Sequence, residues 1–200
     1  MPLGLLGSRV VLEPMRREHF SPLLEVATAD RSTFALTRVP GDGAELERYM
    51  SLALQQRDDG VGIPFVVIEL AKQRVVGSTR FFDIQRWAST TSEDWDAVEI
   101  GATWLSPSVQ RSGLNREMKL LMLQHAFEVR HARRVCLKTD ARNNRSRDAI
   151  AGIGATFEGI LRNFSPASDG PVRDVAMFAI IDREWPEVAA RLRRRLSTSD

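Results

Sequence analysis

The residues whose types and spacing suggest chemistry lie between positions 98 and 115. An apolar run from Val98 to Leu105 contains one carboxylate, Glu99, and Pro107 then breaks the strand ladder. The six residues from Gln110 to Asn115 follow, and apolar residues at helical spacing come after them. A strand, a glycine-containing turn and a helix present unpaired N–H groups and a partial positive charge to an anion. This stretch therefore predicts a phosphate-binding turn, and an ordinary strand-to-helix turn is the alternative.

This turn resembles the phosphate-binding loop of a known family. Gln110-x-x-Gly113-x-Asn115 is similar to the Gln/Arg-x-x-Gly-x-Gly/Ala pyrophosphate loop of the GCN5-related N-acetyltransferases (GNAT). The resemblance is greatest to the RimJ/RimL-type branch, which acetylates protein N-termini and other amines. Asn115 departs from the usual small residue, although Asn is a good helix N-cap and tolerates unusual backbone dihedrals.

A second group of matches lies downstream, and the resemblance extends from Arg9 to Leu196. Thr139-Asp140-x-x-Asn143-x-x-Ser146 precedes Gly154-Ala155-x-x-Glu158-Gly159. Together they resemble the RimJ/RimL pattern of Asn-x-x-Ser before a Gly-Phe/Ala-x-x-Glu-Gly turn. The resemblance implies acetyl-CoA as cosubstrate and no metal, and the three histidines, at positions 19, 125 and 131, have no metal-ligand spacing.

The resemblance also implies which residues bind the cofactor. Backbone N–H groups of the turn would bind the pyrophosphate, with Arg111 adding charge. The end of the preceding strand would pair with the pantetheine amide and offer an oxyanion N–H, because in the family this strand separates from its neighbour. A core strand with all its amides paired is the alternative. The implied cofactor-binding residues are Thr103, Trp104, Leu105, Gln110, Arg111, Ser112, Gly113, Leu114, Asn115, Asn143 and Ser146.

Two catalytic residues are expected, Glu99 and Ser146. An attacking amine must be neutral, a developing oxyanion needs N–H donors, and a leaving thiolate benefits from a proton. Glu99 is a candidate base because a carboxylate within an apolar strand is unfavourable unless it is used or paired. A salt bridge to a neighbouring strand, or exposure at the strand's start, would explain it equally well, and Asp140 is the fallback base.

Asn143 and Ser146 have a functional and a structural interpretation. By resemblance, Asn143 hydrogen-bonds the pantetheine chain and Ser146 lies near the sulfur as a proton donor. The alternative is helix capping, with Asn143 or Asn144 as N-cap and Ser146 in the first turn. Both interpretations are compatible with each other.

Hydrophobic periodicity predicts the elements that position these residues. Strands are expected at 9–14, 64–70, 75–84, 98–105, 134–139, 156–165 and 172–181. Helices are expected at 16–29, from an Asp42 cap to about 57, from the turn at 113 through 129, at 144–153, and after an Asp182 cap. This order predicts a mixed α/β domain with a largely antiparallel central sheet flanked by helices, which is the element order of the GNAT acyl-CoA N-acyltransferase fold.

Composition limits the class of protein. The 200 residues suit one domain, 1–200, with 43% hydrophobic and 27% charged residues. The net charge of +2 does not argue for a nucleic-acid or anionic-membrane partner, and neither DNA nor a membrane is an expected partner. One cysteine, Cys136, excludes an intrachain disulfide and fits a reducing compartment, and no signal peptide is recognised, so a cytoplasmic location is expected.

The expected function is acetyl transfer from acetyl-CoA to a primary amine, which is a protein N-terminus, a lysine or a small amine. A non-catalytic acyl-CoA-binding regulator, a ribosome-associated module, and a transferase using a bulkier donor such as succinyl-CoA are alternatives. The acceptor pocket is expected from the irregular segments 31–43, 87–95 and 162–173. A homodimer is expected from the family and from Trp87 and Trp95, taken as exposed.

Overall fold

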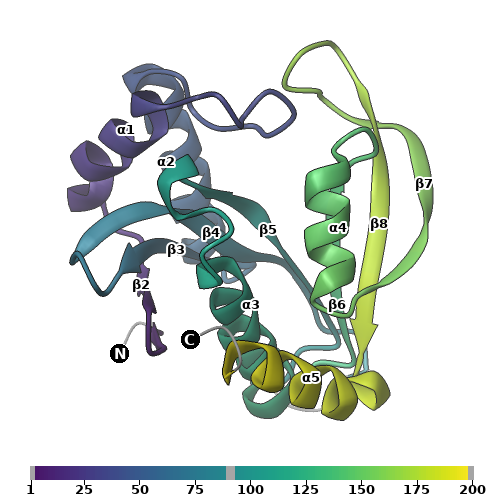
Figure 1. Ribbon diagram of the computed structural model, residues 1–200. Coiled ribbons are helices and arrows are strands. Elements are labelled where there is room, and N and C mark those ends of the chain that lie inside the picture. Colours follow the sequence, from purple (N-terminus) through teal and green to yellow (C-terminus); the bar gives the residue numbers. More distant parts are fainter. Residues whose placement is uncertain (1–2, 89–92, 198–200) are drawn as a thin grey trace.

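One twisted sheet organises the molecule (Figure 1). The computed structural model describes residues 3–88 and 93–197. The strands of this part of the chain are β1 (Leu5–Leu6), β2 (Val10–Pro14), β3 (Gly62–Glu69), β4 (Arg74–Gln85), β5 (Ala97–Leu105), β6 (Arg134–Asp140), β7 (Thr156–Ser165) and β8 (Arg173–Ile181). Their order in the sheet is β1-β2-β3-β4-β5-β6-β8-β7. Neighbours are antiparallel except β5 and β6, which are parallel, so the predicted largely antiparallel sheet is confirmed.

Helices cover both faces of the sheet (Figure 1). They are α1 (Phe20–Ala29), α2 (Gly43–Asp58), α3 (Leu114–Gln124), α4 (Asn144–Gly152) and α5 (Trp185–Ser197). Side chains of α1 and α2 bury one core, in which Leu23 and Met50 meet Trp104 of β5. Side chains of α3, α4 and α5 bury the other core, against the opposite face of the sheet. Because β5 and β6 are parallel, they need a long connection, and α3 supplies that crossover.

Most expected elements are confirmed to within four residues at each end, and three details are wrong. The two-residue strand β1, which pairs with β2, was not expected because two residues carry no alternation pattern. The helix expected through Val129 is α-helical only to Gln124, and His125–Val129 form a π-helical turn. Asp182 does not cap α5: it begins a 3-10 turn (Asp182–Glu184), in which the Glu184 side chain accepts the Ile181 N–H instead.

The connection between β4 and β5 corrects the expectation of two exposed tryptophans. Trp87 is 64% exposed, but Trp95 is 2% exposed and contacts the rings of Phe81 and His125. Residues 89–92 of this connection lie outside the described residues. Trp95 therefore belongs to the core on the α3 face, and it does not line an acceptor pocket.

His125 is a core residue, and its burial predicts a pH-dependent stability. Burial and the adjacent Arg130 lower the pKa of His125 to about 4, against about 6.5 when unfolded. Between these values the unfolded chain binds a proton that the folded chain does not. The free energy of unfolding therefore falls, by about 3 kcal/mol in total, as pH drops from 6.5 to 4.

Urea unfolding of the wild type and His125→Phe between pH 4 and 7 measures this contribution. We expect the variant to lose that part of the pH slope, because phenylalanine does not titrate beside Phe81 and Trp95. His131→Asn is the control: His131 is exposed with φ 50°, a conformation that asparagine tolerates. An unchanged slope in His125→Phe contradicts the prediction.

Candidate functional site

The candidate site lies where β5 and β6 separate. The two strands are paired at three positions, which end at Glu99 and Cys136. Beyond these residues β5 continues to Leu105 and β6 to Asp140 without pairing to each other (Figure 1). We call this opening the split. One edge of β5 therefore presents main-chain groups to the split, and the alternative of a fully paired core strand is wrong.

The bulge in β5 decides which parts of Thr103 and Trp104 face the split. Ala102 has a φ of 47°, and the pairing register between β4 and β5 shifts beside it. Thr103 turns its side chain toward α3, where its Oγ1 lies 2.7 Å from Oγ1 of Thr79 and accepts a 2.8 Å hydrogen bond from Nζ of Lys119. Trp104 is buried against the α1–α2 side. Both residues can therefore serve a ligand in the split only through their main chains.

The predicted phosphate-binding turn has unpaired N–H groups. Gly113 (φ 86°) precedes the first residue of α3, Leu114, whose own N–H makes a long 3.4 Å contact to Oγ of Ser112. Five residues around Gly113 have main-chain N–H groups that make no hydrogen bond within the part of the chain that the structure describes. They are Arg111, Ser112, Gly113, Asn115 and Arg116. A cluster of free N–H groups at a helix N-terminus suits a diphosphate. The residues therefore fit the diphosphate of coenzyme A.

Asn115 lies inside the first turn of α3 and is not its N-cap. Gly113 takes the N-cap position, in a left-handed conformation that a residue with a Cβ rarely adopts. A Cβ on Gly113 would also lie 3.2 Å from Nη1 of Arg9. The left-handed conformation at Gly113 thus lets α3 begin at Leu114, as expected for a helix that starts in this turn.

Gln110, expected to bind the cofactor, bridges the end of β5 to the α1–α2 connection. Its Nε2 donates to the carbonyl of Leu105 and to Oγ1 of Thr33, each at 2.9 Å. Arg145 donates to Oε1 of Gln110 at 3.1 Å and to the carbonyl of Thr33. The carbonyl of Leu105 is therefore already used within the protein.

Sequence analysis did not single out Arg145, and it included Thr33 only within the segment 31–43 expected to form the acceptor pocket. Both residues line a cavity of about 290 Å³ with Asn143 and residues of the α1–α2 connection, namely Ser32, Ala35 and Leu36. Arg145 lies inside the Asn-x-x-Ser motif, so its charge was the available signal. Thr33 lies in a segment without a recognisable motif.

Asn143 and Ser146 adopt the capping arrangement. Asn143 is the N-cap of α4, and its Oδ1 accepts the N–H of Ser146 at 3.0 Å. Asn143 is buried, and no hydrogen bond among the described residues uses its Nδ2. Ser146 is half-buried, and its Oγ has no hydrogen bond in the same part of the chain. The Asn143 amide N–H₂ and the Ser146 hydroxyl therefore remain available to a ligand.

Glu99 forms the salt bridge that was its alternative explanation. Its Oε2 lies 2.7 Å from Nζ of Lys138 on β6, at the narrow end of the split. Burial raises the pKa of Glu99, although the charge of Lys138 acts in the opposite direction. Asp140, the fallback base, is bound by Arg142, and this lowers its pKa. Of these two carboxylates, Glu99 is therefore the stronger base.

Lys119 places a second amine against β5, on the face of the strand that packs on α3. It projects from α3, is 6% exposed, and donates to Oγ1 of Thr103. Burial lowers its pKa to about 7, while the charge of Glu99 acts in the opposite direction. Its contacts lie on the α3 face of β5, away from the side chains of Trp104 and α2.

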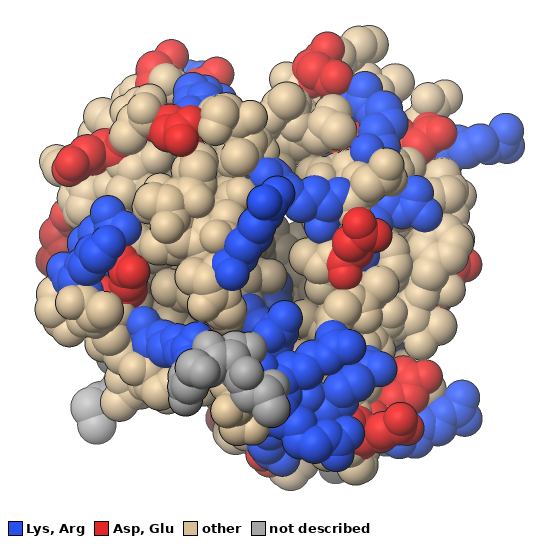
Figure 2. Space-filling model, in the orientation of Figure 1, with Lys and Arg blue, Asp and Glu red and all other residues tan. Residues whose placement is uncertain are grey.

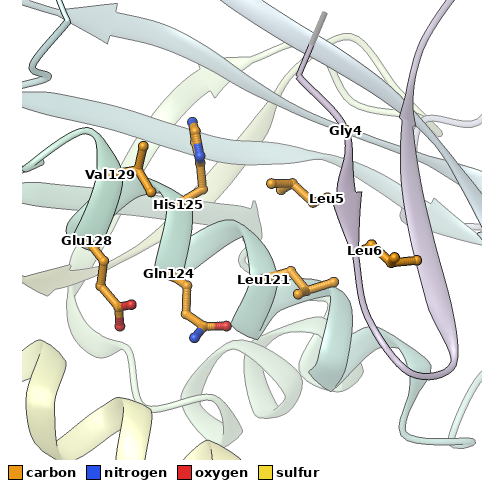
Figure 3. Close-up of a pocket in the computed structure, with 8 residues that line it drawn as sticks. All are labelled: Gly4, Leu5, Leu6, Leu121, Gln124, His125, Glu128 and Val129. Atoms are coloured by element: carbon orange, nitrogen blue, oxygen red, sulfur yellow. The ribbon is translucent and has the colours of Figure 1, made fainter.

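The charge and shape of the molecular surface agree with a ligand site at the split. Figure 2 shows a hollow between the half that carries α1 and α2 and the half that carries α4, β7 and β8, with Lys and Arg side chains beside it. A separate cavity of about 280 Å³ lies between β1 and α3, where Leu5, Leu121 and His125 line it (Figure 3). None of the residues that line this second cavity belongs to the turn or to the split.

One group of side chains has metal-ligating atoms close together. Glu13, Glu18 and His19 place ligand atoms within 4.8 Å of one another. Arg16 pairs with both carboxylates, at 3.7 and 3.0 Å. Both carboxylates of this group are therefore already paired with a guanidinium, and the group lies outside the split.

Comparison with known proteins gives the family. Residues 9–156 match the family model for the acetyltransferase (GNAT) domain, and no protein with a curated description matches the sequence. A GCN5-related N-acetyltransferase from Brucella melitensis is 25% identical, with a TM-score of 0.83 over 97% of this chain and 85% of that one. An acetyltransferase structure from T. thermophilus is 30% identical, with a TM-score of 0.79 over 98% of each chain.

RimJ from Mycobacterium smegmatis, solved in complex with CoA-disulfide, shares the fold. It is 20% identical, with a TM-score of 0.82 over 98% of this chain and 95% of that one. The expected acetyltransferase fold is thus confirmed. In the described part of the chain, none of the helices has the length and apolar composition of a membrane span. The chain belongs to the GNAT family of acetyltransferases.

Proposed function

We propose that this acetyltransferase moves the acetyl group of acetyl-CoA directly to a primary amine in a ternary complex. The observation that carries the proposal is the split, which opens beside the unpaired N–H groups of residues 111–113, 115 and 116. A diphosphate on those groups would let an extended arm follow the free edge of β5 toward Glu99. Positioning two reactants in this way contributes roughly 7–11 kcal/mol to catalysis.

In this proposal, different groups of the chain bind different parts of acetyl-CoA. N–H groups of Arg111, Ser112, Gly113 and Asn115 hold the diphosphate, and the guanidinium of Arg111 adds positive charge. The main chain of Thr103 and its neighbours offers partners to the pantetheine amides, and Nδ2 of Asn143 is a donor across the split. Acetyl-CoA supplies the acyl group as a thioester.

Glu99 is the proposed general base. An amine acceptor arrives as an ammonium ion and must lose a proton before it attacks. Glu99 is 5% exposed, and burial raises its pKa, which makes it a stronger base than an exposed carboxylate. Lys138 keeps the carboxylate charged until the acceptor arrives.

Ser146 is the proposed donor to the leaving thiolate. We expect Ser146→Ala to lower kcat by about 10²-fold, the lower end of the range for general acids, because serine is a weak acid. KM for acetyl-CoA and the melting temperature should change little, since the capping bond uses the backbone N–H of Ser146. Steady-state kinetics with saturating acceptor measure both constants. An unchanged kcat contradicts the role.

The acceptor is a primary amine: a protein N-terminus, a lysine or a small amine. Two of the segments expected to form its pocket are in contact, because Oγ of Ser168 donates to the carbonyl of Ala35 at 2.8 Å. RimL, a ribosomal L7/L12 alpha-N-protein acetyltransferase with the same fold, supports a protein acceptor. We extend the proposal to a cytoplasmic homodimer, and light scattering of the purified chain would establish its mass.

Release of free thiol tests the function. The chain is incubated with acetyl-CoA or succinyl-CoA and a panel of peptides with free N-termini, lysine derivatives and small amines. We expect acceptor-dependent thiol release with acetyl-CoA. Coenzyme A that raises the melting temperature without turnover on any acceptor would instead favour a non-catalytic binding module.

A further inference from the structure

An amine of the chain itself lies beside the proposed general base. Nζ of Lys138 lies 2.7 Å from Oε2 of Glu99, the proposed base. The same Nζ lies 5.4 Å from the ring centre of Phe82 on β4 and 5.2 Å from that of Phe164 on β7. A carboxylate and two aromatic rings form a binding site for a primary ammonium group.

The place of Lys138 along β6 puts this amine at the split. Cys136 is the last residue of β6 paired with β5, and Lys138 is the next residue on the same face. The Lys138 side chain is 24% exposed, whereas that of Glu99 is 7% exposed. The amine is therefore held at the narrow end of the split and is still open to a reactant arriving from it.

We propose that Lys138 is acetylated by the chain's own active site when no external acceptor is bound. This inference rests on the proposed function, because it uses the same cosubstrate and the same base. Glu99 takes one proton from the Lys138 ammonium, and the neutral Nζ attacks the thioester carbonyl. A C–N bond forms and the C–S bond breaks. The thiolate takes up one proton, so the products are acetyl-lysine, coenzyme A thiol and one proton released to solvent.

Acetylation changes the environment of the base. The amide of acetyl-lysine carries no charge, so Glu99 loses the ion pair that Lys138 supplies. The other charged groups that act on Glu99 from packed elements are Asp83 of β4, Arg173 of β8 and, from α3, Lys119. Without that cation the pKa of the buried Glu99 carboxyl rises further, so modification would lower the ionised fraction of the base and would regulate the site.

The lysine content makes the proposal easy to test. The chain has three lysines: Lys72, Lys119 and Lys138. Lys72 is exposed in the turn between β3 and β4, so uncatalysed acetylation by a thioester should reach it first. Lys119 is buried under β5. Lys72 is thus an internal measure of background chemistry.

The experiment incubates the full chain with acetyl-CoA without an acceptor and follows each lysine by peptide mass spectrometry. We expect Lys138 to be acetylated about 10²-fold faster than Lys72, and Glu99→Gln to remove that difference. Lys138→Arg should abolish the modification while Lys72→Arg leaves it unchanged. An unmodified Lys138, or equal rates at Lys72 and Lys138, overturns the proposal.

Two further measurements separate this inference from the proposed function and from misfolding. Thiol release with external amines is followed on the same preparation: turnover there with an unmodified Lys138 defeats the inference and leaves the proposed function standing. A failure of both reactions in a chain that still binds coenzyme A defeats both. Melting temperatures of Lys138→Arg and Glu99→Gln show whether each variant is folded.

Discussion

Glu99→Gln is expected to lower kcat/KM for acetyl transfer by about 10²- to 10⁴-fold, the range that a positioned general base contributes. Glutamine keeps the size of the side chain but cannot take the proton from the acceptor ammonium. The dissociation constant for coenzyme A should stay the same, because Glu99 lies at the narrow end of the split and the diphosphate turn lies beyond Leu105. Steady-state kinetics and calorimetric titration measure the two quantities.

Glu158→Gln is the matched control for this loss. Glu158 also pairs with a cation on β6, Arg134, but it projects from the edge strand β7. Removing its charge breaks a comparable ion pair outside the split, and we expect kcat/KM to remain near that of the wild type. If both variants lose activity equally, ion pairing across the sheet, and not proton transfer, explains the effect.

Gly113→Asp is expected to weaken coenzyme A binding by about 10²-fold, which is about 2.7 kcal/mol. Aspartate brings a negative charge among the N–H groups that would hold the diphosphate. Its Cβ would also lie 3.2 Å from Nη1 of Arg9, at a φ of 86° that side chains disfavour. Calorimetric titration with coenzyme A measures the change in affinity.

Gly60→Asp separates the loss of affinity from backbone strain. Gly60 has a similar φ of 71°, and no atom lies within 4 Å of a Cβ built there. We expect both variants to lose stability, but only Gly113→Asp to lose affinity. Equal affinity in Gly113→Asp and the wild type would exclude the turn as the diphosphate site.

The helices and strands could be predicted because the residues that specify each of them lie close together in the sequence. The apolar run ending at Leu105, the glycine at 113 and the Asp42 cap of α2 each depend on neighbours a few residues away. The side chain of Asp42 does accept the N–H of Glu45. The burial of Trp95 was missed because it depends on Phe81 and His125, which no local pattern connects to it.

The candidate site shows the same difference between local features, which could be predicted, and long-range contacts, which could not. The turn at Gln110–Asn115 was recognisable because a diphosphate contacts consecutive N–H groups. The bridge from Arg145 to Thr33 spans 112 positions of the chain, and no periodicity reports such a contact. The side chain of Gln110 hydrogen-bonds to the carbonyl of Leu105 and does not point into the turn. Arg145, which forms that bridge, also donates to this side chain.

The sequence by itself determined the order of the elements, the phosphate-type turn and the resemblance to the acetyltransferases. The tertiary structure alone decided that β5 and β6 part after three paired positions, and that Glu99 meets Lys138 from 39 positions away. The physical reason is the parallel pairing of these strands. A parallel neighbour is reached through a long crossover, so its register is set by how α3 packs on the sheet and not by adjacent residues.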